Sequence, residues 1–213
     1  KFIFNLNSIG NSAFYGCKLA QFGDLKLPSS LTEIGAQAFQ GCGELTSIEV
    51  PGTVTTIGSY AFAECTKLKK ATINDGVGNI GACIFDSCTA LEEVILPYAG
   101  NSLKSVDEPD SKTNLTYVLF GSRVQDLTYQ GNSYEGYKYW IPNSLKKITI
   151  TGGTRIPSGA FASFSSVTDF VLPETITSIG DSAFANCSNA NFGEAKFIFN
   201  LNSIGNSAFY GCK

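Results

Sequence analysis

The stretch that decides the fold is Ile57-Gly58-Ser59-Tyr60-Ala61-Phe62-Ala63-Glu64-Cys65. Its pattern, I-G-x-x-A-F-x-x-C, occurs in seven copies, one of which is a variant with Pro157 for Gly and Phe164 for Cys. The copies begin at Ile9, Ile34, Ile57, Ile80, Ile156, Ile179 and Ile204, at steps of 25, 23, 23, 76, 23 and 25 residues. A unit of about 23 residues cannot enclose a core by itself, so the copies are expected to stack into a solenoid.

Each copy also predicts its own local structure. Apolar residues alternate over 45–50 and 91–96, and a proline follows each segment, which indicates a short strand closed by a residue that cannot continue it. Phe62 and Cys65 lie three residues apart, which predicts one helical or 3₁₀ turn. Gly58 is expected to begin this turn with a positive φ.

The repeated residues resemble the BspA-like class of leucine-rich repeats, whose element is similar to L-P-x-x-[VL]-T-x-I-G-x-x-A-F-x-x-C-x-x-L-x-x-I. The resemblance covers 1–97 and 154–213. It implies an α/β repeat solenoid: a leucine-rich-repeat right-handed superhelix, strand-rich with short helical or 3₁₀ turns, and with a parallel sheet on one face. Residues 1–213 are therefore interpreted as a single solenoid with irregular coils or an insertion at 98–153, where the 76-residue step is close to the length of three coils.

Composition excludes several classes of function. The 213 residues hold 15 Lys and Arg against 18 Asp and Glu, so a net charge of −3 offers no basic field for nucleic acid. There is no apolar run of about 18 residues, so membrane insertion is not expected. Without a single histidine, neither Ser-His-Asp catalysis nor a histidine zinc site can form. We expect no enzyme activity and no cofactor, and the acids at 107–110 are interpreted as a solvated loop rather than a glycosidase pair.

The chain has seven cysteines, and six of them occupy the last position of the repeat. The favoured interpretation is a ladder of buried thiols, because parallel side chains that point inward have poor geometry for disulfides. A zinc site lacks the paired spacing that it needs. Cys83 lies outside the core register, so it is expected to be the reactive thiol.

The outward positions of the strands supply the first group of candidate binding residues. Alternation places Lys26 opposite Glu49 and Lys70 opposite Glu93 on neighbouring coils. This face could be a partner-binding surface, with Glu49, Lys70 and Glu93 as its candidates, or it could be a solvated face with weak charge pairs.

Aromatic residues of the irregular segment supply the second group. Tyr and Trp suit contacts with peptides or glycans, because a ring can stack while its polar atom forms a hydrogen bond. They could equally fill irregular coils as core, and both interpretations remain open. The candidate binding residues in this segment are Tyr129, Tyr134, Tyr137, Tyr139 and Trp140.

The resemblance also implies a surface or secreted protein that binds host or matrix components. The sequence is therefore interpreted as a non-enzymatic binding or adhesion module for protein, peptide or glycan ligands, at the cell surface or outside the cell. The alternative is a structural spacer that stacks end to end and displays other domains. Residues 1–18 are identical to 196–213, an offset of 195, so head-to-tail self-association is a further expectation.

Overall fold

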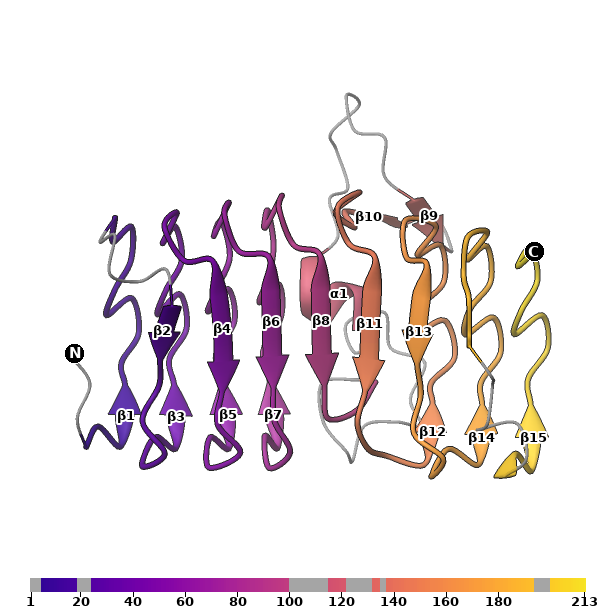
Figure 1. The fold of residues 1–213 in the computed structure, drawn as a ribbon, viewed down its shortest axis with the longest axis horizontal. Helices are drawn as coiled ribbons and strands as arrows, with labels where there is room; N and C mark the ends of the chain where they lie inside the picture. Colours follow the sequence, from indigo (N-terminus) through magenta and orange to yellow (C-terminus); the bar gives the residue numbers. More distant parts are fainter. Residues whose placement is uncertain (1–4, 19–23, 100–114, 122–131, 135–136, 194–199) are drawn as a thin grey trace.

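The computed structural model describes residues 5–18, 24–99, 115–121, 132–134, 137–193 and 200–213. Its coils stack along one long axis, with the two ends of the chain at opposite ends of the stack (Figure 1). Two layers of parallel strands line the solenoid, and the strands of one layer point opposite to those of the other (Figure 1). The solenoid expected from the repeat is therefore present.

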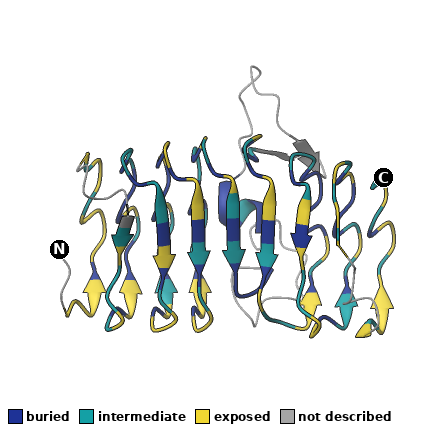
Figure 2. Ribbon diagram, viewed as in Figure 1, coloured by how far each residue is buried: buried dark blue, intermediate teal, exposed yellow. Residues whose placement is uncertain are grey.

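The longer strands form one continuous six-stranded parallel sheet, in the order β13-β11-β8-β6-β4-β2. Equivalent residues of successive coils are paired, as with Ile48, Ala71 and Val94. Buried residues alternate with half-buried or exposed ones along these strands (Figure 2), as expected when every second side chain faces the core. The strands are β2 (Asp24–Lys26), β4 (Ser47–Val50), β6 (Lys70–Ile73), β8 (Glu93–Leu96), β11 (Lys147–Ile150) and β13 (Asp169–Val171).

The second layer consists of two-residue strands, each ending at the Ile of a repeat, and it is divided into two sheets. One holds β1 (Ser8–Ile9), β3 (Glu33–Ile34), β5 (Thr56–Ile57) and β7 (Asn79–Ile80). The other holds β12 (Arg155–Ile156), β14 (Ser178–Ile179) and β15 (Ser203–Ile204).

The division lies at the irregular segment, which contains the helix α1 (Leu115–Phe120) and an antiparallel pair, β9 (Asn132–Tyr134) and β10 (Tyr137–Tyr139). Backbone N–H groups of Ile84 and Phe85 donate to the carbonyls of Val118 and Leu119 at 3.0 and 2.7 Å. The helix therefore continues the stack beside the fourth coil. The 76-residue step from Ile80 to Ile156 is close in length to three coils. Because β8 pairs directly with β11, however, the long sheet has two strands within this step and not three.

The turn of each repeat is not helical, contrary to the prediction of a helical or 3₁₀ turn. In the third copy the left-handed residues are Tyr60 and Glu64, both at φ 58°. These conformations interrupt helical hydrogen bonding and direct alternate N–H groups toward the next coil. The N–H groups of Phe39 and Gly41 accordingly donate to the carbonyls of Ala61 and Ala63, both at 2.8 Å.

Gly58 has a different role from the one expected. It does not belong to the positive-φ residues of the chain. A Cβ at this position would collide with the backbone of Ala36 and lie 2.6 Å from the carbonyl carbon of Gly35. The glycine is thus required for close approach between coils rather than for a left-handed conformation.

Stacked phenylalanines and cysteines fill the core. The rings of Phe39 and Phe62 are 5.5 Å apart and almost parallel, and Phe85 continues the stack at 5.9 Å. The predicted ladder of buried thiols is confirmed for the inner coils, since every cysteine is free and the ladder thiols between the two end coils are buried. Cys17 and Cys212, in the end coils, are half-buried. Each thiol of the ladder after Cys17 donates to the Phe carbonyl of the preceding coil, as Cys65 does to Phe39 at 3.2 Å.

Cys83 does not fit its expected role as the accessible thiol, because only 5% of it is exposed. Its position is one of the left-handed positions of the turn, at φ 59°. Gly121, directly after α1, lies so close that a Cβ there would be 2.7 Å from the thiol sulfur. The helix therefore covers the cysteine, and burial raises its pKa.

Candidate ligand-binding site

The outer face of the long sheet carries a row of paired charges. Lys70 and Lys147 lie on either side of Glu93, with Nζ to carboxylate distances of 2.8 and 3.1 Å. The register predicted for Lys70 and Glu93 is confirmed. The hydrogen bond from Lys70, with that from Lys147, holds the pKa of Glu93 below its usual range.

A groove of about 620 Å³ crosses the same face over β2, β4 and β6, from Ser47 and Lys70 at the start of β4 and β6 to Pro51 and Asn74 just after them. Its floor is part of the hydrogen-bonded sheet, so the groove has a rigid base. The lining residues are Leu25, Lys26, Leu27, Ser29, Ser47, Ile48, Glu49, Pro51, Gly52, Lys70, Thr72 and Asn74. Two of the sequence candidates, Glu49 and Lys70, are among them.

The polar groups of the groove differ in how far they are already engaged. Glu49 is exposed, and its Oε1 accepts a hydrogen bond from Asn74 Nδ2 at 3.1 Å. Lys70 is engaged with Glu93. Lys26 is opposite Glu49 in the register, yet it forms no ion pair with any residue of the described ranges. Lys26 therefore has the ammonium group that is most available to a ligand.

Sequence reasoning placed Lys26 on this face but did not include it among the candidate binding residues, and it missed Asn74. The sequence did contain a signal for Asn74. The strands before and after it in the sheet are followed by Pro51 and Pro97, and Asn74 stands at the equivalent position. Asparagine keeps an N–H that proline lacks, and this N–H donates to the Val50 carbonyl at 3.1 Å. Its side chain adds an amide to the groove.

The aromatic candidates are only partly placed. Tyr129 lies outside the described residues, as do the acids at 107–110. Tyr134 and Tyr137 are Cα partners in the antiparallel pair, and Tyr139 ends its second strand. Trp140 is half-buried. Tyr134, Tyr137 and Tyr139 belong to this antiparallel pair and not to the strands that line the groove.

Two other aromatic residues of the irregular segment belong to the core. Tyr98 is 3% exposed, and its hydroxyl donates to the Val77 carbonyl at 2.7 Å. Phe120, 1% exposed, contacts the ring of Phe164 with centroids 6.3 Å apart. For these two positions the core interpretation is correct.

Within the described part of the chain, no cluster of three or more Cys, Asp or Glu side chains could hold a metal ion. No helix there has both the length and the apolar composition needed to cross a bilayer.

Comparison with known proteins identifies the family. The family model for the BspA type leucine rich repeat region matches residues 7–138 and 102–213, with six copies. The chain belongs to the BspA-type leucine-rich repeat family. The resemblance found in the sequence is thereby confirmed.

Solved leucine-rich repeat proteins are similar to this BspA-type chain. One from Eubacterium ventriosum has a TM-score of 0.55 at 20% identity, covering 87% of this chain and 42% of its own. Another from T. pallidum, TpLRR, is 24% identical with a TM-score of 0.43, covering 97% of this chain and 70% of its own.

A leucine rich cell surface protein from Faecalibacterium prausnitzii is 22% identical with a TM-score of 0.39, covering 95% of this chain and 52% of its own. No curated protein sequence matches the chain. The likeness to the Eubacterium ventriosum protein establishes the fold alone, and this chain spans less than half of that protein.

Proposed function

We propose that this chain is a non-enzymatic binding module of a surface or secreted protein, and that it holds a protein, peptide or glycan ligand in the groove across β2, β4 and β6. The observation that carries the proposal is the groove itself, because it combines a rigid floor with convergent polar side chains. Membership of the BspA-type family and similarity to a leucine rich cell surface protein support the location at the cell surface.

The chemistry of the groove favours a ligand with both acceptors and donors. Lys26 offers an ammonium group, Glu49 a carboxylate and Asn74 an amide, within one depression. The apolar residues Leu25 and Leu27 are among its lining residues as well. Such a surface suits a short extended peptide or a sugar, since both present hydrogen-bonding groups beside apolar area.

The structural spacer remains the second candidate function. The burial of Tyr98 and Phe120 favours it, because these rings of the irregular segment fill the core instead of meeting a ligand. A spacer needs a regular, continuous stack, which the six-stranded sheet provides.

The test is binding of the chain to immobilised panels of matrix proteins and glycans, compared with a Lys26→Ala/Asn74→Ala variant. We expect the affinity of the variant to be at least tenfold lower for any panel member that binds the original chain, because the Lys26 and Asn74 side chains line the groove. A second variant, Tyr137→Ala/Trp140→Ala, tests the antiparallel pair as an alternative site.

Lys67→Ala is the matched control. Lys67 is as exposed as the groove lysines, but it pairs with Glu44 at 2.8 Å and is not a lining residue. The groove would be excluded as the binding site if Lys67→Ala lost binding. It would also be excluded if the Tyr137→Ala/Trp140→Ala variant lost binding while Lys26→Ala/Asn74→Ala kept it. No binding by any chain across both panels would favour the spacer.

A further inference from the structure

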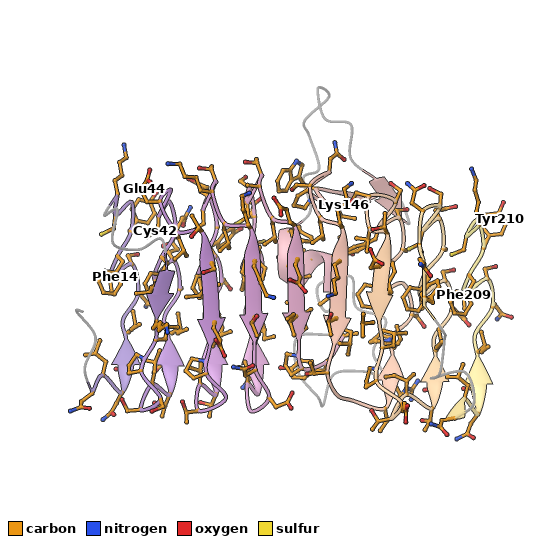
Figure 3. The ribbon with its side chains drawn as sticks, in the orientation of Figure 1. Phe14, Cys42, Glu44, Lys146, Phe209 and Tyr210 are labelled. Carbon is orange, nitrogen blue, oxygen red and sulfur yellow. The ribbon has the colours of Figure 1, made fainter. Side chains whose placement is uncertain are left out.

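The outer face of the long sheet carries two rows of side chains over the four strands β6, β8, β11 and β13. In the first row the charges alternate in sign from strand to strand: Lys70, Glu93, Lys147 and Asp169. In the second row, two residues further along each strand, the residues are uncharged and β-branched: Thr72, Ile95, Thr149 and Val171. The long sheet is the front layer in Figure 3, so both rows face the viewer.

The charges of the first row are not equally engaged within the chain. Glu93 pairs with the lysines on both sides of it. Asp169 forms no ion pair in the described part of the chain, although Lys147 is its Cα partner. Its carboxylate accepts a hydrogen bond from Thr168 Oγ1 at 2.6 Å. The row therefore ends on an exposed acid that is available to a cation from outside the chain.

The second row is apolar on these four strands but charged on the strands before them. Its members on β2 and β4 are Lys26 and Glu49, as expected for a face in contact with water. On β13 the same row holds Val171, which is 46% exposed. β-Branched side chains form an even surface on a sheet, which the face of another sheet can cover.

The order of the charges is complementary to itself. A two-fold axis parallel to the strands, midway between β8 and β11, reverses the row in a second copy. Lys70 then lies opposite Asp169 of the second copy, and Glu93 lies opposite Lys147 of the second copy. The symmetry repeats both pairs, so all four contacts join opposite charges.

This axis also brings the second row against itself. Rotation about an axis parallel to the strands keeps each residue at its height along the strand, so Thr72 lies opposite Val171 and Ile95 opposite Thr149. Placing the axis on β8 would instead set Glu93 against Glu93 of the second copy. Placing it on β11 would do the same with Lys147. Like charges in contact are costly, so the alternation selects the axis between the two strands.

We propose that the outer face of β6, β8, β11 and β13 is the docking surface for a second copy of the chain, related to the first by this two-fold axis. The contact uses the same patch on both copies, so assembly stops at two. Apolar area from the second row drives the contact, and the charges fix its register because their attraction is largely offset by lost hydration. Lys70 also lines the groove, so a ligand there and the second copy compete for it.

The test separates contacts between copies from contacts within one chain. Lys70→Glu sets two acids against each other across the interface, and Asp169→Lys sets two lysines against each other. We expect the original chain to pass from one copy of 22.7 kDa to two copies between micromolar and millimolar concentration in sedimentation experiments. Each variant alone should require about tenfold or more higher concentration to pair.

An equimolar mixture of the two variants should pair as well as the original chain. In a mixed pair, Glu at position 70 of one copy faces Lys at position 169 of the other, and the second contact keeps its original residues. Mixing leaves the contacts within each chain unchanged, so the recovery reports the interface alone.

Glu33→Lys is the matched control, because it makes the same charge change as Asp169→Lys on an exposed residue of the short-strand layer. It should pair like the original chain, and circular dichroism shows whether every variant is folded. An original chain that stays at one copy up to millimolar concentration would overturn the proposal. So would a mixture of folded variants that pairs no better than either variant alone, or a control that loses pairing as Asp169→Lys does.

Discussion

At the residue scale, the backbone of each repeat has two different requirements that the sequence pattern does not distinguish. One is close approach between coils, and the other is a left-handed conformation in the turn. The glycine that follows the repeat Ile at positions such as Gly58 and Gly81 serves close approach, since a Cβ there would enter the backbone of the preceding coil. The left-handed positions, by contrast, are held by residues such as Tyr60 and Ser182. A side chain can be accommodated at a positive φ at moderate cost, but no conformation makes room for a Cβ where two backbones touch.

Gly58→Ala should therefore lower the free energy of unfolding by about 1–3 kcal/mol, the range for overpacking a tight site. Gly78→Ala is the control, because a Cβ there would lie 3.5 Å from the Thr55 carbonyl oxygen, an ordinary contact. The control should change stability by less than about 0.5 kcal/mol. Urea unfolding of both variants measures the difference, and equal effects would show that crowding between coils is not the reason for the glycine.

The cysteines show what sequence reasoning can and cannot reach at this scale. Their shared position predicted a buried ladder, and burial indeed raises the pKa of Cys42 and Cys187 to about 12. The misassigned thiol, Cys83, follows the repeat only locally. Its burial depends on α1, which begins 32 residues later and belongs to no repeat, so no pattern around Cys83 could indicate it.

At the element scale, the strands were predictable and the turns were not. Alternation of apolar residues and the prolines after Val50 and Leu96 located the long strands, because burial on one face imposes a period of two. The spacing of Phe62 and Cys65 suits a helical turn and also suits the observed turn with left-handed residues. The observed turn is stabilised by hydrogen bonds to the neighbouring coil. The sequence of a single repeat unit does not reveal these bonds.

The charge row on the long sheet gives the prediction at this scale. Glu93→Gln should lower the free energy of unfolding at pH 7 by roughly 0.5–1 kcal/mol, because two lysines pair with one partly exposed carboxylate. The lowered pKa of Glu93 means that its stabilisation is present above the usual glutamate pKa of about 4.3. It is lost as the pH falls through the pKa in the folded state.

The difference between the original chain and Glu93→Gln should therefore shrink between pH 7 and pH 3 in urea unfolding. Glu44→Gln serves for comparison, since Glu44 pairs with a single, more exposed lysine, Lys67, and should show a smaller effect. A difference that persists unchanged at pH 3 would mean that Glu93 acts through packing and not through its charge.

At the scale of the whole molecule, the sequence predicted a stack of coils but not the junction at the irregular segment. The regular coils on either side of the irregular segment follow the repeat, so their register could be derived from Ile and Phe spacing. The groove lies beyond such reasoning, because it is formed by residues of three neighbouring coils together, including Asn74, which departs from the repeat. The junction at α1 is equally specific to this chain.

We expect that junction to set the cooperativity of the fold. The short-strand layer is interrupted there, so the two groups of coils are joined by the pairing of β8 with β11 and by the packing of α1. In a repeat protein, stability is approximately a sum of terms for coils and their interfaces, and unfolding divides at the weakest interface. Phe120, 1% exposed and in contact with Phe164, lies in this interface.

Phe120→Ala should therefore uncouple the two groups of coils, beyond the loss of about 3–5 kcal/mol expected for a buried phenylalanine. Hydrogen exchange in increasing urea should show 156–213 and 24–97 losing protection at different concentrations in the variant and closer together in the original chain. Phe62→Ala is the control, because Phe62 is fully buried between Phe39 and Phe85 within the first group. It should weaken that group with less effect on 156–213. If Phe120→Ala instead lowers protection equally throughout, α1 is one rung of a uniform stack, and the continuous six-stranded sheet alone is enough to couple the molecule.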